Sequence, residues 1–264
     1  MWSALDVILR YATDVPVAIA TLLDAVRPAF ERGGRDGSPA RVCELGFGPG
    51  WFLEEMLAAF PGVKLLGLDL SRPAVESAVA DSALRRAGQR AIEVLQGDME
   101  RLPFGGGAFD ALVTCWTLYF MRDIDAALAG MRRCVREGGL FVTATVAPDH
   151  MREFDETVGE AVRRALGRER EPDIGARFDL ATGLAPMQRA FGDVDVREYS
   201  GEIVLPDVAT AMVLWPGYGP QLADAEEDAA ARVEFERMVS EVIALEGVWR
   251  MRRHDGVFVA TVRQ

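Results

Sequence analysis

Between residues 41 and 146, short apolar segments alternate regularly with segments that have the composition of helices. The apolar segments show little alternation of polar and apolar residues, as expected for strands whose two faces are both covered by helices. Strands that alternate with helices indicate a doubly wound α/β sheet. The predicted strands are residues 41–45, 63–69, 91–96, 109–115 and 140–146, and the predicted helices are residues 51–60, 73–87 and 123–136, the last closed by Gly138-Gly139.

The segments before residue 41 and after residue 146 lack this regular alternation of strands and helices. Residues 3–31 are predicted to form two helices, the second entered through Asp14 and Pro16. After residue 146, the sequence predicts helices at 149–168, 182–191 and most of 206–246, and strands at 194–199 and 256–262. The expected fold is a Rossmann-like seven-stranded sheet with N-terminal helices and a helical lid inserted between the last two strands.

This pattern divides the chain into three predicted parts. Residues 1–40 form an N-terminal helical cap, and residues 41–148 form the core that binds the cofactor. Residues 149–264 complete the sheet and carry the lid, at about 206–246, over the substrate site.

Charge and cysteine content exclude several classes of function. The net charge of −12 would repel a phosphate backbone, so no nucleic-acid partner is expected. No apolar run is long enough to span a membrane and no signal peptide is evident, so we expect a cytoplasmic protein with no membrane partner. Three widely spaced cysteines without a C-x-x-C motif predict neither disulfides nor a metal site.

The loop V-C-E-L-G-F-G-P-G-W, residues 42–51, lies where such a sheet binds its ligand. A Walker-type phosphate loop needs Lys-Ser or Lys-Thr, which is missing here. The dinucleotide fingerprint G-x-G-x-x-G would need glycine at position 51, where Trp51 stands. Glycine-rich turns of this kind bind nucleoside triphosphates, dinucleotides or S-adenosylmethionine (SAM), and these residue types weaken the first two possibilities. Asp69, at the end of the second strand, suits a ribose of either NAD or SAM.

Four stretches together resemble the class I SAM-dependent methyltransferases, in the small-molecule branch that includes quinone-biosynthesis enzymes. They are V-C-E-L-G-F-G-P-G, L-L-G-L-D-L-S, Q-G-D-M-E-R-L-P-F-G-G-G-A-F-D-A-L-V-T and R-R-C-V-R-E-G-G-L-F-V-T, in order over about residues 41–146. The resemblance implies SAM as cofactor and S-adenosylhomocysteine as product. Pro49 departs from the family pattern and removes one N–H from the loop.

The resemblance also implies roles for individual cofactor-binding residues. The backbone of Gly46, Phe47 and Gly48 would line the methionine part of SAM, which Glu44 would help to orient. Asp69 would hold the ribose, and Leu70 would pack on the adenine. Asp98 and Met99 would read the adenine edge, while the backbone near Cys115 would face the sulfonium. Cys115 itself is interpreted as a small residue that closes a strand, because no proline precedes it.

Candidates for catalysis are fewer. His150 follows the fifth strand, where histidine is suited to act as a general base. The alternative is that His150 is an exposed loop or helix-start residue. Tyr11 could reach the cofactor carboxylate or the substrate, or pack at a helix end. His254 lies in a charged, turn-like stretch and is expected at the surface. The predicted substrate pocket consists of Trp116, Tyr119, Trp215 and Tyr218.

The expected activity is transfer of a methyl group from SAM to an O, N or C atom of a small apolar or aromatic metabolite. Natural-product biosynthesis is the expected setting, and the protein is expected to be a monomer or homodimer. Two alternatives remain open at this point: a non-catalytic SAM-binding auxiliary protein and a nicotinamide-dependent oxidoreductase.

Overall fold

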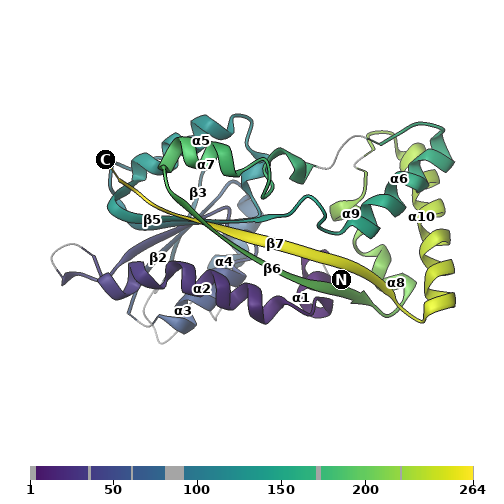
Figure 1. The fold of residues 1–264 in the computed structure, drawn as a ribbon, viewed down its shortest axis with the longest axis horizontal. Coiled ribbons are helices and arrows are strands. Elements are labelled where there is room, and N and C mark those ends of the chain that lie inside the picture. The colour runs from purple at the N-terminus through teal and green to yellow at the C-terminus, as the bar shows by residue number, and fades with distance from the viewer. Residues whose placement is uncertain are drawn as a thin grey trace. The chain divides into compact units, whose positions relative to one another are not determined.

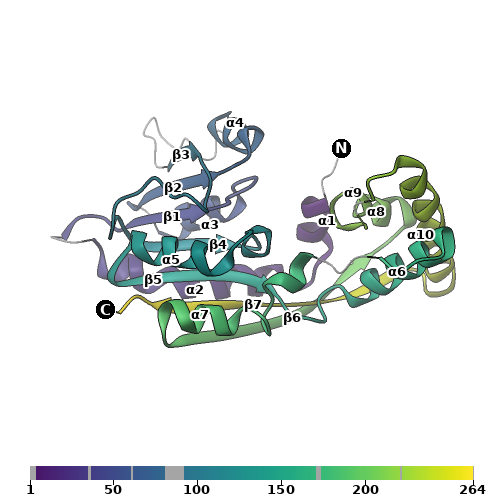
Figure 2. The same ribbon diagram turned by 90° about the horizontal axis from the view of Figure 1, so that it is seen from above.

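The computed structural model describes residues 4–34, 37–60, 62–80, 92–170, 174–220 and 222–263. The strands are β1 (Arg41–Leu45), β2 (Lys64–Asp69), β3 (Ile92–Gln96), β4 (Phe109–Cys115), β5 (Val135–Val146), β6 (Val194–Leu205) and β7 (Trp249–Thr261). The helices are α1 (Ala4–Tyr11), α2 (Val15–Arg32), α3 (Trp51–Ala59), α4 (Arg72–Ala80), α5 (Ile124–Cys134), α6 (Arg152–Leu166), α7 (Leu184–Phe191), α8 (Val208–Met212), α9 (Trp215–Tyr218) and α10 (Ala225–Glu246). Figure 1 labels most of these elements, and Figure 2 also labels β1 and β4.

The chain divides into two compact units. The core unit comprises Val17–Ala147, Arg177–Glu198 and Asp255–Gln264, and the accessory unit comprises Met1–Pro16, Pro148–Ala176 and Tyr199–His254. The predicted cap, residues 1–40, is thus shared between the two units, with nearly all of α2 in the core unit.

The sheet has the strand order β3-β2-β1-β4-β5-β7-β6. Strands β1 to β5 pair in parallel, as predicted, and the chain order reverses between β1 and β4. Such a reversal opens a crevice at the carboxyl ends of the strands, where ligands of α/β sheets bind. In Figures 1 and 2, α2 and α3 lie on one face of the core sheet, and α5 and α7 lie on the other. This arrangement confirms the predicted seven-stranded fold.

The last strand runs in the opposite direction to β5, because the two strands pair in the antiparallel sense. It also begins at Trp249, seven residues before the predicted start at residue 256. Buried and exposed side chains alternate from Trp249 to Arg253, which is the period of a strand. The charged residues of this stretch suggested a turn, but its alternation of buried and exposed side chains is that of a strand. His254 therefore lies within a strand and is partly buried, not in an exposed turn.

Two further boundaries differ from the prediction. Helix α5 ends at Cys134, and Gly138-Gly139 lies inside β5 instead of closing the helix. Val135 is already extended and pairs with Phe109, so the strand begins before the glycines. Strand β6 likewise continues from the predicted end at residue 199 to Leu205.

The predicted helix at 73–87 corresponds to α4 as far as Ala80. Residues 81–91 lie outside the described residues, and so does Ala91 of the third predicted strand. Ser71 caps α4, because its hydroxyl accepts a hydrogen bond from the Ala74 N–H at 3.4 Å. In the part of the chain that the structure describes, no helix has the length and apolarity needed to cross a membrane.

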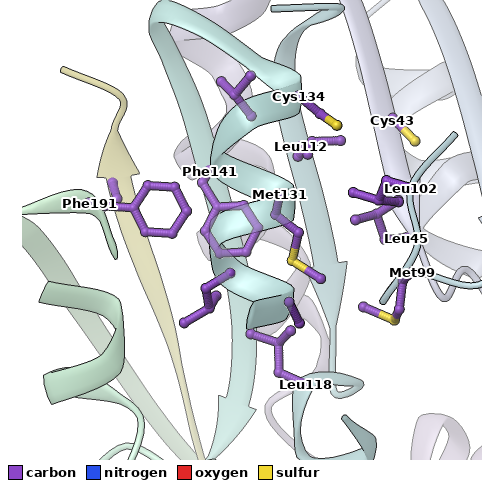
Figure 3. Close-up of a cluster of buried hydrophobic side chains, with 14 of the residues drawn as sticks. Cys43, Leu45, Met99, Leu102, Leu112, Leu118, Met131, Cys134, Phe141 and Phe191 are labelled. Carbon is purple, nitrogen blue, oxygen red and sulfur yellow. The ribbon is translucent and has the colours of Figure 1, made fainter. Parts of the chain in front are cut away.

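One hydrophobic cluster of the core unit lies between the sheet and helices α5 and α7. Figure 3 shows part of this cluster, in which the rings of Phe141 and Phe191 stack with centroids 4.7 Å apart. Met131 of α5 and Leu112 of β4 are fully buried beside them. This packing fixes the strands whose carboxyl ends carry the candidate site.

The accessory unit has its own core. Helix α10 packs on α6 and α8, and α1 packs on α9. Phe154, Phe235 and Trp249 form a ring cluster at its centre, with centroid distances between 5.4 and 6.1 Å. Helices α8, α9 and α10 follow β6 and precede β7 along the chain, where the lid was predicted. That these helices cover a substrate site stays a prediction.

Candidate active site

The glycine loop between β1 and α3 has a left-handed backbone at each of its three glycines. Gly46, Gly48 and Gly50 have φ values of +68°, +53° and +86°. A Cβ atom on Gly46 would lie 2.6 Å from Cγ2 of Thr117, so no side chain fits there. A Cβ on Gly48 would meet nothing within 4 Å. The loop is thus packed on one side and open on the other, as a ligand-binding backbone must be.

Asp69 is the last residue of β2, and its carboxylate is held by two main-chain donors. Oδ2 accepts from the Gly48 N–H at 2.8 Å, and Oδ1 accepts from the Ser71 N–H at 2.7 Å. Only 9% of the residue is exposed. Each carboxylate oxygen has further acceptor capacity, so Asp69 can still accept from ligand hydroxyls.

Glu44 belongs to β1, two residues before Gly46, and is 2% exposed. Its Oε2 has no hydrogen-bond partner among the described residues. Burial raises the pKa of this carboxyl well above its usual value, and the charge of Asp69 raises it further. A buried carboxylate without a partner fits a ligand that carries positive charge, and SAM carries both an ammonium and a sulfonium group. The residues present therefore fit this cofactor.

The predicted adenine side of the site is also assembled at this edge. Leu70 is 69% exposed, so its side chain is accessible to a ligand. Asp98 accepts the Glu100 N–H at 2.8 Å, and Met99 beside it is buried. The side chain of Phe47 is buried against Gly67, where a Cβ would lie 2.7 Å from its ring. Only the backbone of Phe47 is left for a ligand.

Cys115 ends β4 and is buried, which agrees with its interpretation as a small residue that closes a strand. Burial raises the pKa of its thiol, with Glu44 as a second cause, so the reactive thiolate is disfavoured. The hydroxyl of Thr117 donates to the Cys115 carbonyl at 2.7 Å. Trp116 and Tyr119 of the predicted substrate pocket follow directly in the core unit.

Two side chains that hold the segment after β4, at residues 121–123, were not predicted from the sequence to do so. Glu100 accepts hydrogen bonds from the N–H groups of Arg122 and Asp123, at 2.9 and 3.3 Å. Arg177, which follows this segment in the chain whereas Glu100 precedes it, donates to the Met121 carbonyl at 2.6 Å. These partners are more than 20 and more than 50 residues apart, so no local pattern pointed to them.

The accessory unit holds the two catalytic candidates. Nδ1 of His150 lies 3.1 Å from the His254 carbonyl oxygen. A carbonyl can only accept, so Nδ1 carries the proton and Nε2 is the acceptor in the neutral ring. His254 in turn contacts Asp149 through Nδ1 at 2.7 Å. Tyr11 ends α1 and packs against the accessory core. The catalytic roles of His150 and Tyr11 stay predictions.

The other half of the predicted pocket also belongs to the accessory unit. Trp215 is 3% exposed, its ring contacts Phe235 with centroids 5.0 Å apart, and its indole N–H donates to Asp228 at 3.2 Å. Tyr218 packs against the same core. Since Trp116 and Tyr119 lie in the other unit, a common pocket for these four residues stays a prediction.

Part of the chain matches a known protein family. Residues 43–143 match a family described as a methyltransferase domain. A demethylmenaquinone methyltransferase of Roseiflexus castenholzii is 33% identical over 172 residues, covering 60% of this chain and 70% of the relative. A malonyl-[acyl-carrier protein] O-methyltransferase of Laribacter hongkongensis is 32% identical over 140 residues, covering 52% of this chain and 44% of that relative. The match to this second relative thus spans less than half of its length.

The fold has solved counterparts. The YcgJ protein of Bacillus subtilis superposes with a TM-score of 0.57 at 16% identity, covering 91% of this chain and 99% of that one. At this identity the likeness concerns the fold alone.

Proposed function

The chain belongs to the class I SAM-dependent methyltransferases, and from this premise we propose that it methylates a small metabolite at an O, N or C atom. The acceptor we propose is apolar or aromatic. We place the reaction in natural-product biosynthesis, within the cytoplasm. We propose that the protein acts as a monomer or homodimer. S-adenosylhomocysteine is the second product. The similarity to a demethylmenaquinone methyltransferase supports a small-molecule acceptor.

One arrangement carries this proposal. The N–H of Gly48 in the glycine loop donates to Asp69, and two residues before the loop's first glycine, Oε2 of Glu44 is buried without a hydrogen-bond partner among the described residues. A nicotinamide dinucleotide would place a pyrophosphate in such a loop, close to two carboxylates that would repel it. SAM, in contrast, presents an ammonium group and a sulfonium group. The electrostatics of the site therefore favour the methyltransferase over the oxidoreductase alternative.

When bound, SAM supplies an already activated methyl group, so the protein has to bind and orient the cofactor and the acceptor and to exclude water. We assign the ribose hydroxyls to Asp69 and the adenine to Leu70, Asp98 and Met99. Glu44 and the backbone of Gly46, Phe47 and Gly48 hold the methionine part, with the carbonyl region of Cys115 facing the sulfonium. Every one of these residues belongs to the core unit.

For proton removal we propose His150. Its tautomer leaves Nε2 as the basic nitrogen, and the His254 carbonyl fixes the ring. Tyr11 is proposed to contact the cofactor carboxylate or the acceptor. Trp116, Tyr119, Trp215 and Tyr218 are proposed to line the acceptor pocket under the lid formed by residues 206–246.

The cofactor is tested by calorimetry of the purified chain with SAM, S-adenosylhomocysteine and NAD. We expect the first two ligands to bind and NAD to show no heat of binding. Binding of NAD without SAM would reject the proposal. Methyl transfer is tested separately with methyl-labelled SAM and a panel of phenols, quinols and amines. SAM binding with no labelled product from any of these acceptors would support the auxiliary-protein alternative.

A further inference from the structure

Trp116 has a backbone conformation that is rare for a bulky residue. Its φ is +50°, and in the described part of the chain Met151 is the other non-glycine residue with a positive φ. This region is strained for an aromatic residue, and such strain persists only where surrounding contacts enforce it. The Trp116 main-chain N–H donates to the Ala144 carbonyl at 2.9 Å, which anchors the strained residue to β5.

The indole ring of Trp116 is held by two side chains. Its Nε1–H donates to Oδ1 of Asp255 at 3.4 Å, and Asp255 is fully buried on β7. The ring of Trp51, the first residue of α3, lies with its centroid 5.8 Å away and its plane tilted by 38°. With these contacts made, Trp116 is still partly exposed.

The ring also stands next to the glycine loop. Trp51 directly follows Gly50 of that loop. Thr117, the residue after Trp116, has its methyl carbon 2.6 Å from the place where a Cβ on Gly46 would be. Trp116 thus lies beside the segment assigned to the methionine part of SAM, which is the part that carries the transferable methyl group.

We propose that Trp116 determines acceptor specificity by presenting a fixed aromatic face on which a planar, unsaturated ring stacks. Asp255 acts as a positioning residue that fixes the rotation of the indole. This inference rests on the proposed function and narrows its acceptor to an aromatic or quinone-type ring. A pre-ordered ring loses little entropy on binding, and a stacked pair contributes about 2- to 10-fold in affinity beyond burial alone.

The test measures binding of two probes of similar size to the full chain saturated with S-adenosylhomocysteine. The probes are 1-naphthol, which is planar, and decahydro-1-naphthol, which is saturated and puckered. For the unaltered protein we expect about 10-fold tighter binding of 1-naphthol. Trp116→Leu should bring the ratio of the two affinities close to one. Trp116→Phe keeps a ring and should retain part of the ratio, which also guards against misfolding of the leucine variant.

Asp255 is tested with a matched pair of variants. Asp255→Asn keeps an oxygen that can accept the indole N–H and should preserve the ratio of affinities, whereas Asp255→Ala should lower it at least 3-fold. A ratio that is unchanged in Trp116→Leu, or the absence of any preference for 1-naphthol in the unaltered protein, overturns the inference. Failure of the proposed function is recognised earlier, because S-adenosylhomocysteine would then not bind at all.

Discussion

The carboxylate of Asp69 accepts a hydrogen bond from the main-chain N–H of Gly48 at 2.8 Å. The two residues are 21 positions apart, at the carboxyl ends of neighbouring strands. The bond fixes the shape of the glycine loop and at the same time orients the carboxylate. Changes at either residue are therefore expected to affect both the loop and the ligand.

Asp69→Ala should weaken SAM binding by about 100-fold, because both the ribose acceptor and the brace on Gly48 are lost. Asp69→Asn keeps one acceptor oxygen and should lose about 10-fold. Calorimetric titration with SAM measures both values. Affinity that is unchanged in the alanine variant would remove the ribose assignment.

Gly46→Ala should destabilise the fold more than Gly48→Ala, although both positions have a positive φ. The left-handed backbone costs either alanine about 1 kcal/mol, but only the one at position 46 also meets the Thr117 methyl group. Chemical denaturation measures the two free energies of unfolding. Adding Thr117→Ser, which removes that methyl group, should recover part of the loss in Gly46→Ala and none in Gly48→Ala.

Glu44→Gln should raise the stability of the ligand-free protein and lower its affinity for SAM. Because the folded-state pKa of Glu44 is raised, the folded chain binds a proton that the unfolded chain has already released. Stability from this group is therefore lost as the pH rises through the folded-state pKa, where the buried carboxylate becomes charged.

We expect Glu44→Gln to be more stable than the unaltered protein by about 1 kcal/mol at pH 8, and equally stable at acidic pH where Glu44 is protonated. SAM affinity should fall about 10-fold at pH 8, because a charge-assisted contact is lost. Thermal unfolding and calorimetry across this pH range test both statements. A difference in stability that grows toward low pH would contradict the assignment.

Asp110→Ala should destabilise the core unit by about 3–5 kcal/mol. Asp110 is 4% exposed, forms an ion pair with Arg136 and accepts the Arg41 N–H at 2.8 Å. Its removal leaves the Arg136 charge without its partner in a largely buried position. The exposed pair Arg72–Glu76 is the matched control, since Glu76→Ala there should cost less than about 1 kcal/mol. Equal losses in the two variants would contradict this distinction.

His150→Gln should lower kcat about 100-fold or more while SAM affinity stays within a factor of two, if His150 removes a proton from the acceptor. The same change at His254 keeps the backbone carbonyl that His150 contacts and is the matched control, with an expected loss below 10-fold. Rates are measured with whichever acceptor of the panel gives labelled product. Similar kcat values for His150→Gln and the unaltered protein would remove the general-base role.

The sequence by itself determined most of the elements between residues 41 and 146, and it placed the glycine loop and Asp69 at one edge of the sheet. Strands at 41–45 and 109–115 have the predicted bounds, since buried parallel strands are continuous apolar runs with clear punctuation. The glycine loop and Asp69 are local to strand ends, and parallel strands bring their carboxyl ends to one edge. Residue type and spacing were therefore sufficient to place them together.

Only the tertiary structure decided what joins distant parts of the chain. The contact of Trp116 with Asp255 spans 139 residues, and the antiparallel direction of β7 set which residue faces the indole. The strand from Trp249 was hidden by its charges, because arginines on its exposed face masked the alternation that buries its other face. Local preference fixes helices and strands, whereas pairing over such separations depends on which chain direction packs the whole sheet.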